Sequence, residues 1–131
     1  MSAAVAVSRF RGRYPPNWPE IAGRVKTEAG WRCVRCEHPH DPPAGRTLTV
    51  HHLDGDKANG RWWNLLPLCQ ACHLSVQARV FLEQPWLFEH SEWFKPYAAG
   101  WYAASYEGNP EITRTEAETR MDELLALERL A

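Results

Sequence analysis

Two Cys-x-x-Cys pairs constrain the fold of this chain of 131 residues more than any other feature. The first pair is Cys33 and Cys36, and the second, Cys69 and Cys72, follows after 32 intervening residues. Each pair places two thiolates in one turn, and four thiolates complete the tetrahedral ligand set of a zinc ion. Zinc binding would contribute about 10–16 kcal/mol to the folding of a small module. Because four thiolates leave no open coordination position, the predicted role of this Zn²⁺ is structural.

The alternative for the four cysteines is two disulfides or four free thiols. Residues 1–7 are small and apolar but have no basic residue ahead of them, so they do not match a secretory signal. We therefore expect a reducing cytoplasm, in a bacterium or a phage-infected cell and close to the nucleoid, where cysteines remain thiols or bind metal. No apolar run reaches the roughly 20 residues that span a bilayer, so no membrane partner is expected.

The charges are divided unevenly along the chain, although the formal net charge is only −1. Residues 1–61 hold ten Lys or Arg and six Asp or Glu, whereas residues 62–131 hold five and ten. A basic first half favours contact with nucleic-acid phosphates in that half. An ordinary solvated surface with segregated charge would give the same counts. The hydrophobic share of 44% and the charged share of 24% are those of a folded globular chain.

Three segments are predicted along the chain. Residues 1–16 are a basic N-terminal arm, which either contacts phosphates or is simply a solvated terminus. Residues 17–84 form the zinc module, and residues 85–131 form an aromatic-rich helical extension packed on it. The candidate DNA contacts of the arm are its alternating arginines, Arg9, Arg11 and Arg13.

The module begins with a predicted helix. Asn17 is expected to cap it, Pro19 lies in its first turn, and Gly30 follows its end. Residues 47–50 alternate as a strand does, and this strand ends at His51 and His52. Consecutive strand residues point to opposite sides, so one histidine could bind a metal while the other faces a reacting group.

The rest of the chain is predicted to be mostly helical. Residues 53–61 are a loop rich in turn residues, with a second short strand possible close behind it. Helices are expected over about residues 70–84 and over residues 113–130. Between them, an aromatic stripe at helical spacing is assigned to the core, with Pro96 in the first turn of its helix. The residues of that stripe are Trp93, Phe94, Tyr97 and Trp101.

Three histidines and an asparagine remain once four sulfurs satisfy the zinc. They lie in the stretch Val50-His-His-Leu-Asp-Gly-Asp-Lys-Ala-Asn-Gly-Arg-Trp-Trp-Asn-Leu-Leu-Pro-Leu-Cys-Gln-Ala-Cys-His73, which resembles the HNH endonuclease family. In that family a His-His or Asp-His pair ends the first strand, an Asn follows after a loop, and a His lies nine residues after that Asn. Asn64 and His73 have this spacing. The zinc-carrying branch of the family also flanks the site with two Cys-x-x-Cys pairs.

The resemblance implies a small α+β fold, a ββα-metal module with a Cys₄ zinc site, that acts as a metal-dependent DNA endonuclease. His51 and His73 would bind one divalent cation, and His52 would be the general base that deprotonates the attacking water. Asn64 would fix the loop and orient His52 by hydrogen bonding. The products would carry 5′-phosphate and 3′-hydroxyl ends. The cation is open among Mg²⁺, Mn²⁺, Ni²⁺ and Zn²⁺, and Gln77 is a candidate group beside the metal rather than a direct ligand.

Two other functions fit part of the sequence. A zinc-ribbon DNA-binding module without catalysis needs only the cysteines and the basic residues, and it gives His52 and Asn64 no task. A phage or assembly protein would use residues 85–131 to bind a protein partner or a second copy of the chain.

In the loop over residues 53–61, Lys57 and Arg61 are candidate phosphate contacts, although loops are commonly charged. The adjacent Trp62 and Trp63 could contact DNA, although one of them is expected in the core.

Overall fold

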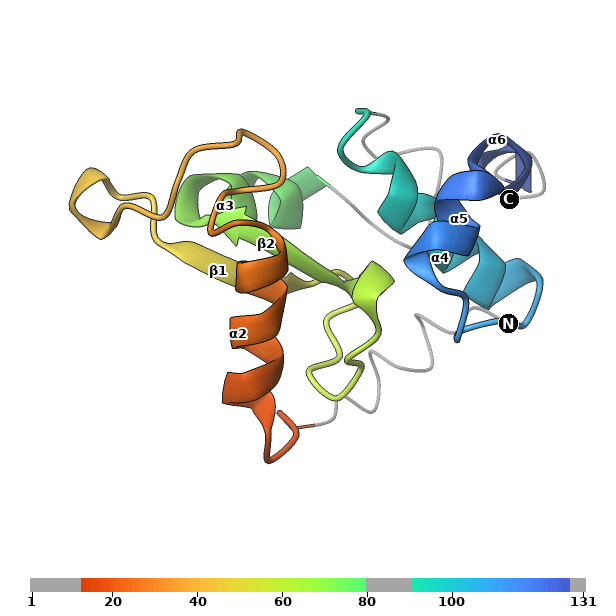
Figure 1. Cartoon of the computed structure of the whole chain (residues 1–131), viewed down its shortest axis with the longest axis horizontal. Coiled ribbons are helices and arrows are strands. Elements are labelled where there is room, and N and C mark those ends of the chain that lie inside the picture. The colour runs from red at the N-terminus through yellow and green to blue at the C-terminus, as the bar shows by residue number, and fades with distance from the viewer. Residues whose placement is uncertain (1–12, 80–90, 128–131) are drawn as a thin grey trace.

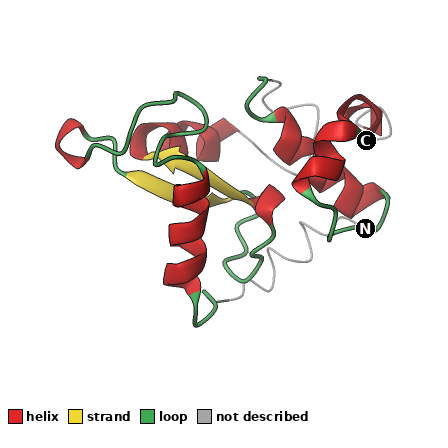
Figure 2. Cartoon of the chain, viewed as in Figure 1, coloured by secondary structure: helices red, strands yellow, loops and turns green. Residues whose placement is uncertain are grey.

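The computed structural model describes residues 13–79 and 91–127, with an antiparallel pair of strands at its centre (Figure 1). β1 (Leu48–His52) pairs with β2 (Leu65–Cys69), so that Leu48 lies opposite Cys69 and His52 lies opposite Leu65. Within the described ranges this is the only sheet, and five α-helices are arranged around it (Figure 2). The fold is small α+β, as the sequence predicts.

α2 (Trp18–Glu28) begins as predicted, with a proline in its first turn. Asn17 occupies the N-cap position, but the prediction that its side chain caps the helix is wrong. Its φ of −95° and ψ of 24° are those of a turn, whereas a capping side chain needs extended backbone at that position. The helix ends at Glu28, and Gly30 follows its C-cap residue as predicted, with a φ of 65° in the left-handed region that favours glycine.

α3 (Gln70–Arg79) follows β2 directly and lies on the face of the sheet that carries Thr49 and His51. α2 lies on the other face, where its first residue, Trp18, contacts His52. The predicted end of the α3 helix, near residue 84, is outside the described residues. The two helices therefore enclose the hairpin, and the side chains of β1 point alternately toward each of them.

α4 (Lys95–Tyr106) is the helix predicted from the aromatic stripe, with Pro96 in its first turn. Its residues 96–103 are buried, and Figure 1 shows it with α5 and α6 at one end of the sheet. Trp86 and Phe88 lie outside the described residues. None of the helices that the structure describes is long and apolar enough to cross a bilayer. The stripe is core as predicted for three of its four residues: Phe94 is 0% exposed, and Tyr97 and Trp101 are also buried. Trp93 is half-buried and packs against this core.

The C-terminal helix is broken in two. The sequence predicts one helix over residues 113–130, but the structure has α5 (Arg114–Thr119) and α6 (Met121–Leu125). The hydroxyl of Thr119 donates to the carbonyl of Thr115 at 2.9 Å. Such a bond competes with the backbone ladder and bends helices, and α5 ends at this threonine. Arg120, between the two helices, has a φ of −101° and a ψ of 20°, which depart from helical values, and apolar spacing does not reveal this break.

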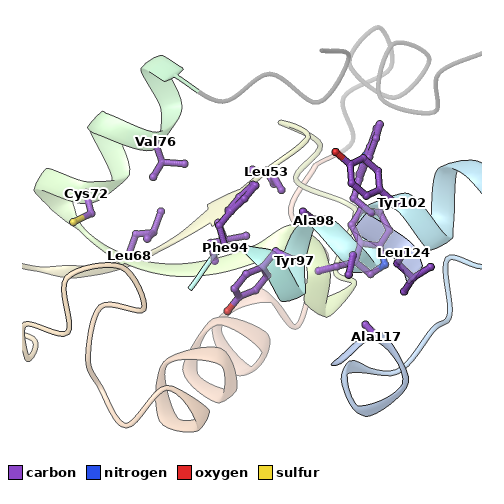
Figure 3. Packing of buried hydrophobic residues seen from close by; sticks show 14 of the residues in the cluster. Leu53, Leu68, Cys72, Val76, Phe94, Tyr97, Ala98, Tyr102, Ala117 and Leu124 are labelled. Atoms are coloured by element: carbon purple, nitrogen blue, oxygen red, sulfur yellow. The ribbon is translucent and has the colours of Figure 1, made fainter. Parts of the chain in front are cut away.

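One hydrophobic core joins the sheet to the C-terminal helices. Figure 3 shows Phe94 between the group around Leu68 and Val76 and the group around Tyr102 and Leu124.

Two short 3₁₀ helices, η1 (Pro42–Ala44) and η2 (Trp62–Asn64), lie in the loops that flank β1. Both indoles of η2 reach the segment before α5: Trp62 Nε1 donates to the carbonyl of Ile112 and Trp63 Nε1 to that of Pro110. The tryptophan pair thus anchors the extension on the module.

Candidate zinc cluster and active site

The four cysteines come together in one cluster, with all their sulfur atoms within 4.8 Å of one another. The sulfurs of Cys36 and Cys69 are 3.7 Å apart. Sulfurs at roughly 2.3 Å from a tetrahedral zinc ion are about 3.8 Å apart, so the spacing fits. Cys33 lies in the turn after α2, Cys69 is the last residue of β2, and Cys72 lies in the first turn of α3. The cluster can hold a zinc ion, and it joins these three parts of the chain.

Two arginines donate hydrogen bonds to the sulfurs. Arg46 Nη1 lies 3.6 Å from the sulfur of Cys69 and 3.7 Å from that of Cys36, and Arg35 Nη1 lies 3.6 Å from that of Cys72. Burial raises the pKa of Cys69, but hydrogen bonds from the Cys72 backbone and from Arg46 lower it to about 6. Burial raises the pKa of Cys72 to about 12, although the hydrogen bond from Arg35 lowers it. Arg46 and Arg35 thus each act toward the thiolate form that binds metal, and for Cys72 burial is the larger effect. Cysteine spacing alone predicts neither of them.

His51 and His73 face each other between β1 and α3. Nδ1 of His51 lies 3.0 Å from Nε2 of His73. Two imidazole nitrogens roughly 2.1 Å from one cation are about 3.0 Å apart when they occupy adjacent positions about 90° apart. The pair therefore fits two neighbouring ligands of a divalent cation. The same distance also fits a hydrogen bond between two neutral imidazoles.

Both imidazoles of this pair are neutral at pH 7. Burial lowers the pKa of His51 from 6.5 to about 4, and the neighbouring His73 and His52 add to the effect. Burial also lowers the pKa of His73. Neutral imidazole is the form that binds metals, so no proton has to be removed from an imidazolium first.

Thr49 holds the far side of the His73 ring. Its hydroxyl oxygen lies 2.8 Å from His73 Nδ1 and 2.7 Å from the carbonyl oxygen of Leu68. This residue is not among those singled out from the sequence. The signal that points to it is the two-residue alternation of β1, which puts Thr49 and His51 on one face.

His52 points to the opposite face of β1 and is buried there, with 7% of its surface exposed. Trp18 lies against its ring with centroids 4.8 Å apart, and Tyr14 meets it at 5.8 Å. Nε2 of His52 is, in residues 13–79 and 91–127, the only buried side-chain nitrogen or oxygen without a hydrogen-bond partner. Burial lowers the pKa of His52. The structure thus brings His51 and His73 together and places His52 apart from them, under two aromatic rings.

Asn64 is fully buried and closes the loop between β1 and β2. Its Oδ1 accepts from the amide of Asp54 at 2.8 Å, and its Nδ2 donates to the carbonyl of Asn59 at 2.9 Å. In the described part of the chain its side chain makes no hydrogen bond to His52. The link is indirect, because the carbonyl of Asn64 accepts from the amide of Leu53, the residue after His52.

Two of the predicted site residues lie away from the histidine pair. Gln77 is exposed, and its side chain makes no hydrogen bond among the described residues. Arg61 donates to Glu111 through Nε at 3.1 Å and through Nη2 at 2.9 Å. Its guanidinium is therefore engaged with the segment before α5, which a phosphate contact would have to displace.

The other candidate DNA contacts lie near His52 or outside the described residues. Lys57 Nζ lies 4.9 Å from the ring centroid of Tyr14, which in turn contacts His52. Arg13 is exposed next to Tyr14 in the chain. Arg9 and Arg11 lie outside the described residues. Lys57 and Arg13 thus both lie next to Tyr14, one of the two aromatic residues that cover His52.

Comparisons with known proteins add no relative. No family model, no curated protein and no solved structure matches the chain. The features of this chain that point to a function are therefore the cysteine cluster, the histidine pair and the order of the motif along the sequence.

Proposed function

We propose that the protein is a metal-dependent DNA endonuclease of the HNH type, which hydrolyses phosphodiester bonds to 5′-phosphate and 3′-hydroxyl ends. The observation that supports this most is the pair of His51 Nδ1 and His73 Nε2, 3.0 Å apart. These are the two residues that the HNH resemblance assigns to the metal. They lie in a β1–β2–α3 unit, the order of elements in a ββα-metal module, next to a cysteine cluster that can hold zinc.

His51 and His73 are the proposed ligands of the catalytic cation. A divalent cation held by them would act as a Lewis acid that stabilises the negative charge developing on the phosphate and on the departing 3′ oxygen. Two neutral nitrogen donors leave the remaining coordination positions for water and phosphate oxygens. This donor set accepts Mg²⁺, Mn²⁺, Ni²⁺ or Zn²⁺.

His52 is the proposed general base. Its lowered pKa keeps it neutral at pH 7, the form that can accept a proton from water. Because Nε2 is buried, the proton would be accepted at the other ring nitrogen, Nδ1. Tyr14 and Trp18 would have to turn away for water and a phosphate to reach this ring. Asn64 would act through the loop that it closes.

The burial of His52 favours a second candidate function, a zinc-containing DNA-binding module without catalysis. In that case His51 and His73 would share a hydrogen bond instead of a cation, and the basic residues would carry DNA binding. The cysteine cluster would serve the same structural role in both cases. The two candidates differ in whether a divalent cation other than the zinc is needed for any activity.

Incubation of the zinc-loaded protein with supercoiled plasmid separates the two candidates. The reactions would contain Mg²⁺, Mn²⁺, Ni²⁺ or no added cation, and the ends of the products would be tested for ligation. Cleavage that needs an added cation, leaves 5′-phosphate ends and is lost in His51→Ala supports the endonuclease. DNA binding in a mobility-shift assay without cleavage under any cation supports the binding module.

A further inference from the structure

We propose that Thr49 is a positioning residue that holds His73 in the tautomer whose Nε2 is free to bind a cation. The inference rests on the proposed function, because it names the residue that prepares one ligand of the proposed metal site. It concerns a hydrogen-bond chain on the α3 face of β1 that the HNH motif does not include.

The direction of each hydrogen bond in this chain follows from the chemistry of its three groups. The carbonyl oxygen of Leu68 can only accept, and it lies 2.7 Å from the hydroxyl oxygen of Thr49. The single hydroxyl proton of Thr49 is therefore used on Leu68. At 2.8 Å from His73 Nδ1, the hydroxyl oxygen then has only lone pairs to offer. Nδ1 of His73 must be the donor in this contact.

A neutral imidazole carries one proton, so a proton on Nδ1 leaves a lone pair on Nε2. Nε2 of His73 is the atom that lies 3.0 Å from Nδ1 of His51. Metal-bound histidines commonly donate their other N–H to a protein oxygen, which fixes both the tautomer and the orientation of the ring. Thr49 gives His73 this support.

The strand makes the chain of contacts rigid. Thr49 pairs with Leu68 in the register of β1 and β2, so the carbonyl that orients the hydroxyl is part of the sheet itself. His51 is two residues further along β1 and shares the face of Thr49. A substitution at position 49 therefore changes the support of His73 and leaves both proposed ligand residues in the chain.

Nitrogen NMR of ¹⁵N-labelled, zinc-loaded protein without any other divalent cation tests the tautomer directly. We expect His73 to be protonated at Nδ1 in the native protein and in Thr49→Ser, which keeps the hydroxyl. In Thr49→Val, of similar shape but without the hydroxyl, this preference should be lost. A native His73 protonated at Nε2, or an unchanged tautomer in Thr49→Val, would overturn the inference. The native spectrum alone tests it even if the valine variant fails to fold.

Binding of Mn²⁺ to the zinc-loaded protein, followed by the EPR signal of free Mn²⁺, tests the consequence. Thr49→Val should weaken binding about 10- to 100-fold, as the loss of such supporting groups does, and Thr49→Ser should bind like the native protein. Equal Mn²⁺ affinity in all three would overturn the role of Thr49. If the native protein, like His51→Ala, binds no Mn²⁺, the metal site of the proposed function fails. The tautomer experiment still decides the hydrogen-bond chain in that case.

Discussion

The indole of Trp18 lies against the imidazole of His52, with ring centroids 4.8 Å apart and planes inclined by 35°. Trp18 is the first residue of α2, and His52 is the last residue of β1. Tyr14 covers a further part of the same imidazole. The proposed general base is therefore reached only past two aromatic side chains, one of which, Tyr14, is itself 48% exposed.

Removal of the outer ring should make His52 accessible. We expect Tyr14→Ala to speed the modification of His52 by diethylpyrocarbonate several-fold, because the reagent attacks a neutral ring nitrogen that it can reach. Tandem mass spectrometry of peptides measures the rate. Tyr106→Ala, which removes a tyrosine of comparable exposure from α4, is the matched control and should not change it. Rapid modification of His52 in the native protein would contradict the proposed cover.

Gly100 is the closest approach between α4 and η2. A Cβ there would lie 2.6 Å from Cβ of Trp63, whose side chain is buried and held by its hydrogen bond to Pro110. Gly100→Ala should therefore destabilise the zinc-loaded protein by about 1–3 kcal/mol in chemical denaturation. Gly23→Ala, in α2 with no atom within 4 Å of the added carbon, should instead stabilise it by up to about 1 kcal/mol. Effects of the same sign would show that the contact with Trp63 is not as close as described.

Asn64 should control the loop through its two side-chain bonds. Asn64→Ala leaves the buried amide of Asp54 and the carbonyl of Asn59 without partners, at a cost of about 1–3 kcal/mol for each. Asn64→Asp keeps an acceptor for Asp54 but places an oxygen against the Asn59 carbonyl. Hydrogen exchange at the Asp54 amide should therefore be fast in the alanine variant and slow in the aspartate variant. Slow exchange in both would exclude this bond as the one that holds the loop.

Cys33→Ser should remove the zinc and unfold the module. Cys33 is buried and is one of four sulfurs in a cluster that joins the turn after α2 to β2 and α3. Loss of a zinc ion that contributes about 10–16 kcal/mol exceeds the stability of a small domain. Elemental analysis gives the zinc content, and circular dichroism with thermal melting gives the fold. A variant that keeps both its zinc and its melting temperature would refute the four-cysteine site.

Local patterns were enough to predict much of the fold. The strand that ends at His51 and His52 follows from alternation, and α4 follows from aromatic spacing with a proline in the first turn. The cysteine cluster follows from two short spacings, since each Cys-x-x-Cys turn presents both sulfurs on one side. These features depend on residues that are close together in the sequence.

Features that depend on distant contacts could not be predicted in this way. Nothing in the motif says that Trp18 covers His52, because the two residues meet only when α2 packs on the sheet. The role proposed for Thr49 also follows only from the structure, in which its hydroxyl contacts His73. The bond between Arg46 and the sulfur of Cys69 likewise joins segments that are separate in the sequence. The chain also leaves the helical conformation at Arg120, between α5 and α6, even though the apolar spacing continues.

The most direct test of the account is the rate of plasmid nicking by zinc-loaded native protein and by His52→Ala, measured with the cation that gives the fastest cleavage. His38→Ala is the matched control, because it removes a histidine whose ring, within the described residues, bonds only to the neighbouring Pro39 carbonyl. Zinc content and melting temperature are checked for each protein. If His52 is the general base of an endonuclease, His52→Ala loses cleavage while it stays folded, and His38→Ala cuts like the native protein. Equal cleavage by the native protein and His52→Ala, or no cleavage by either with any cation, would contradict this role of His52.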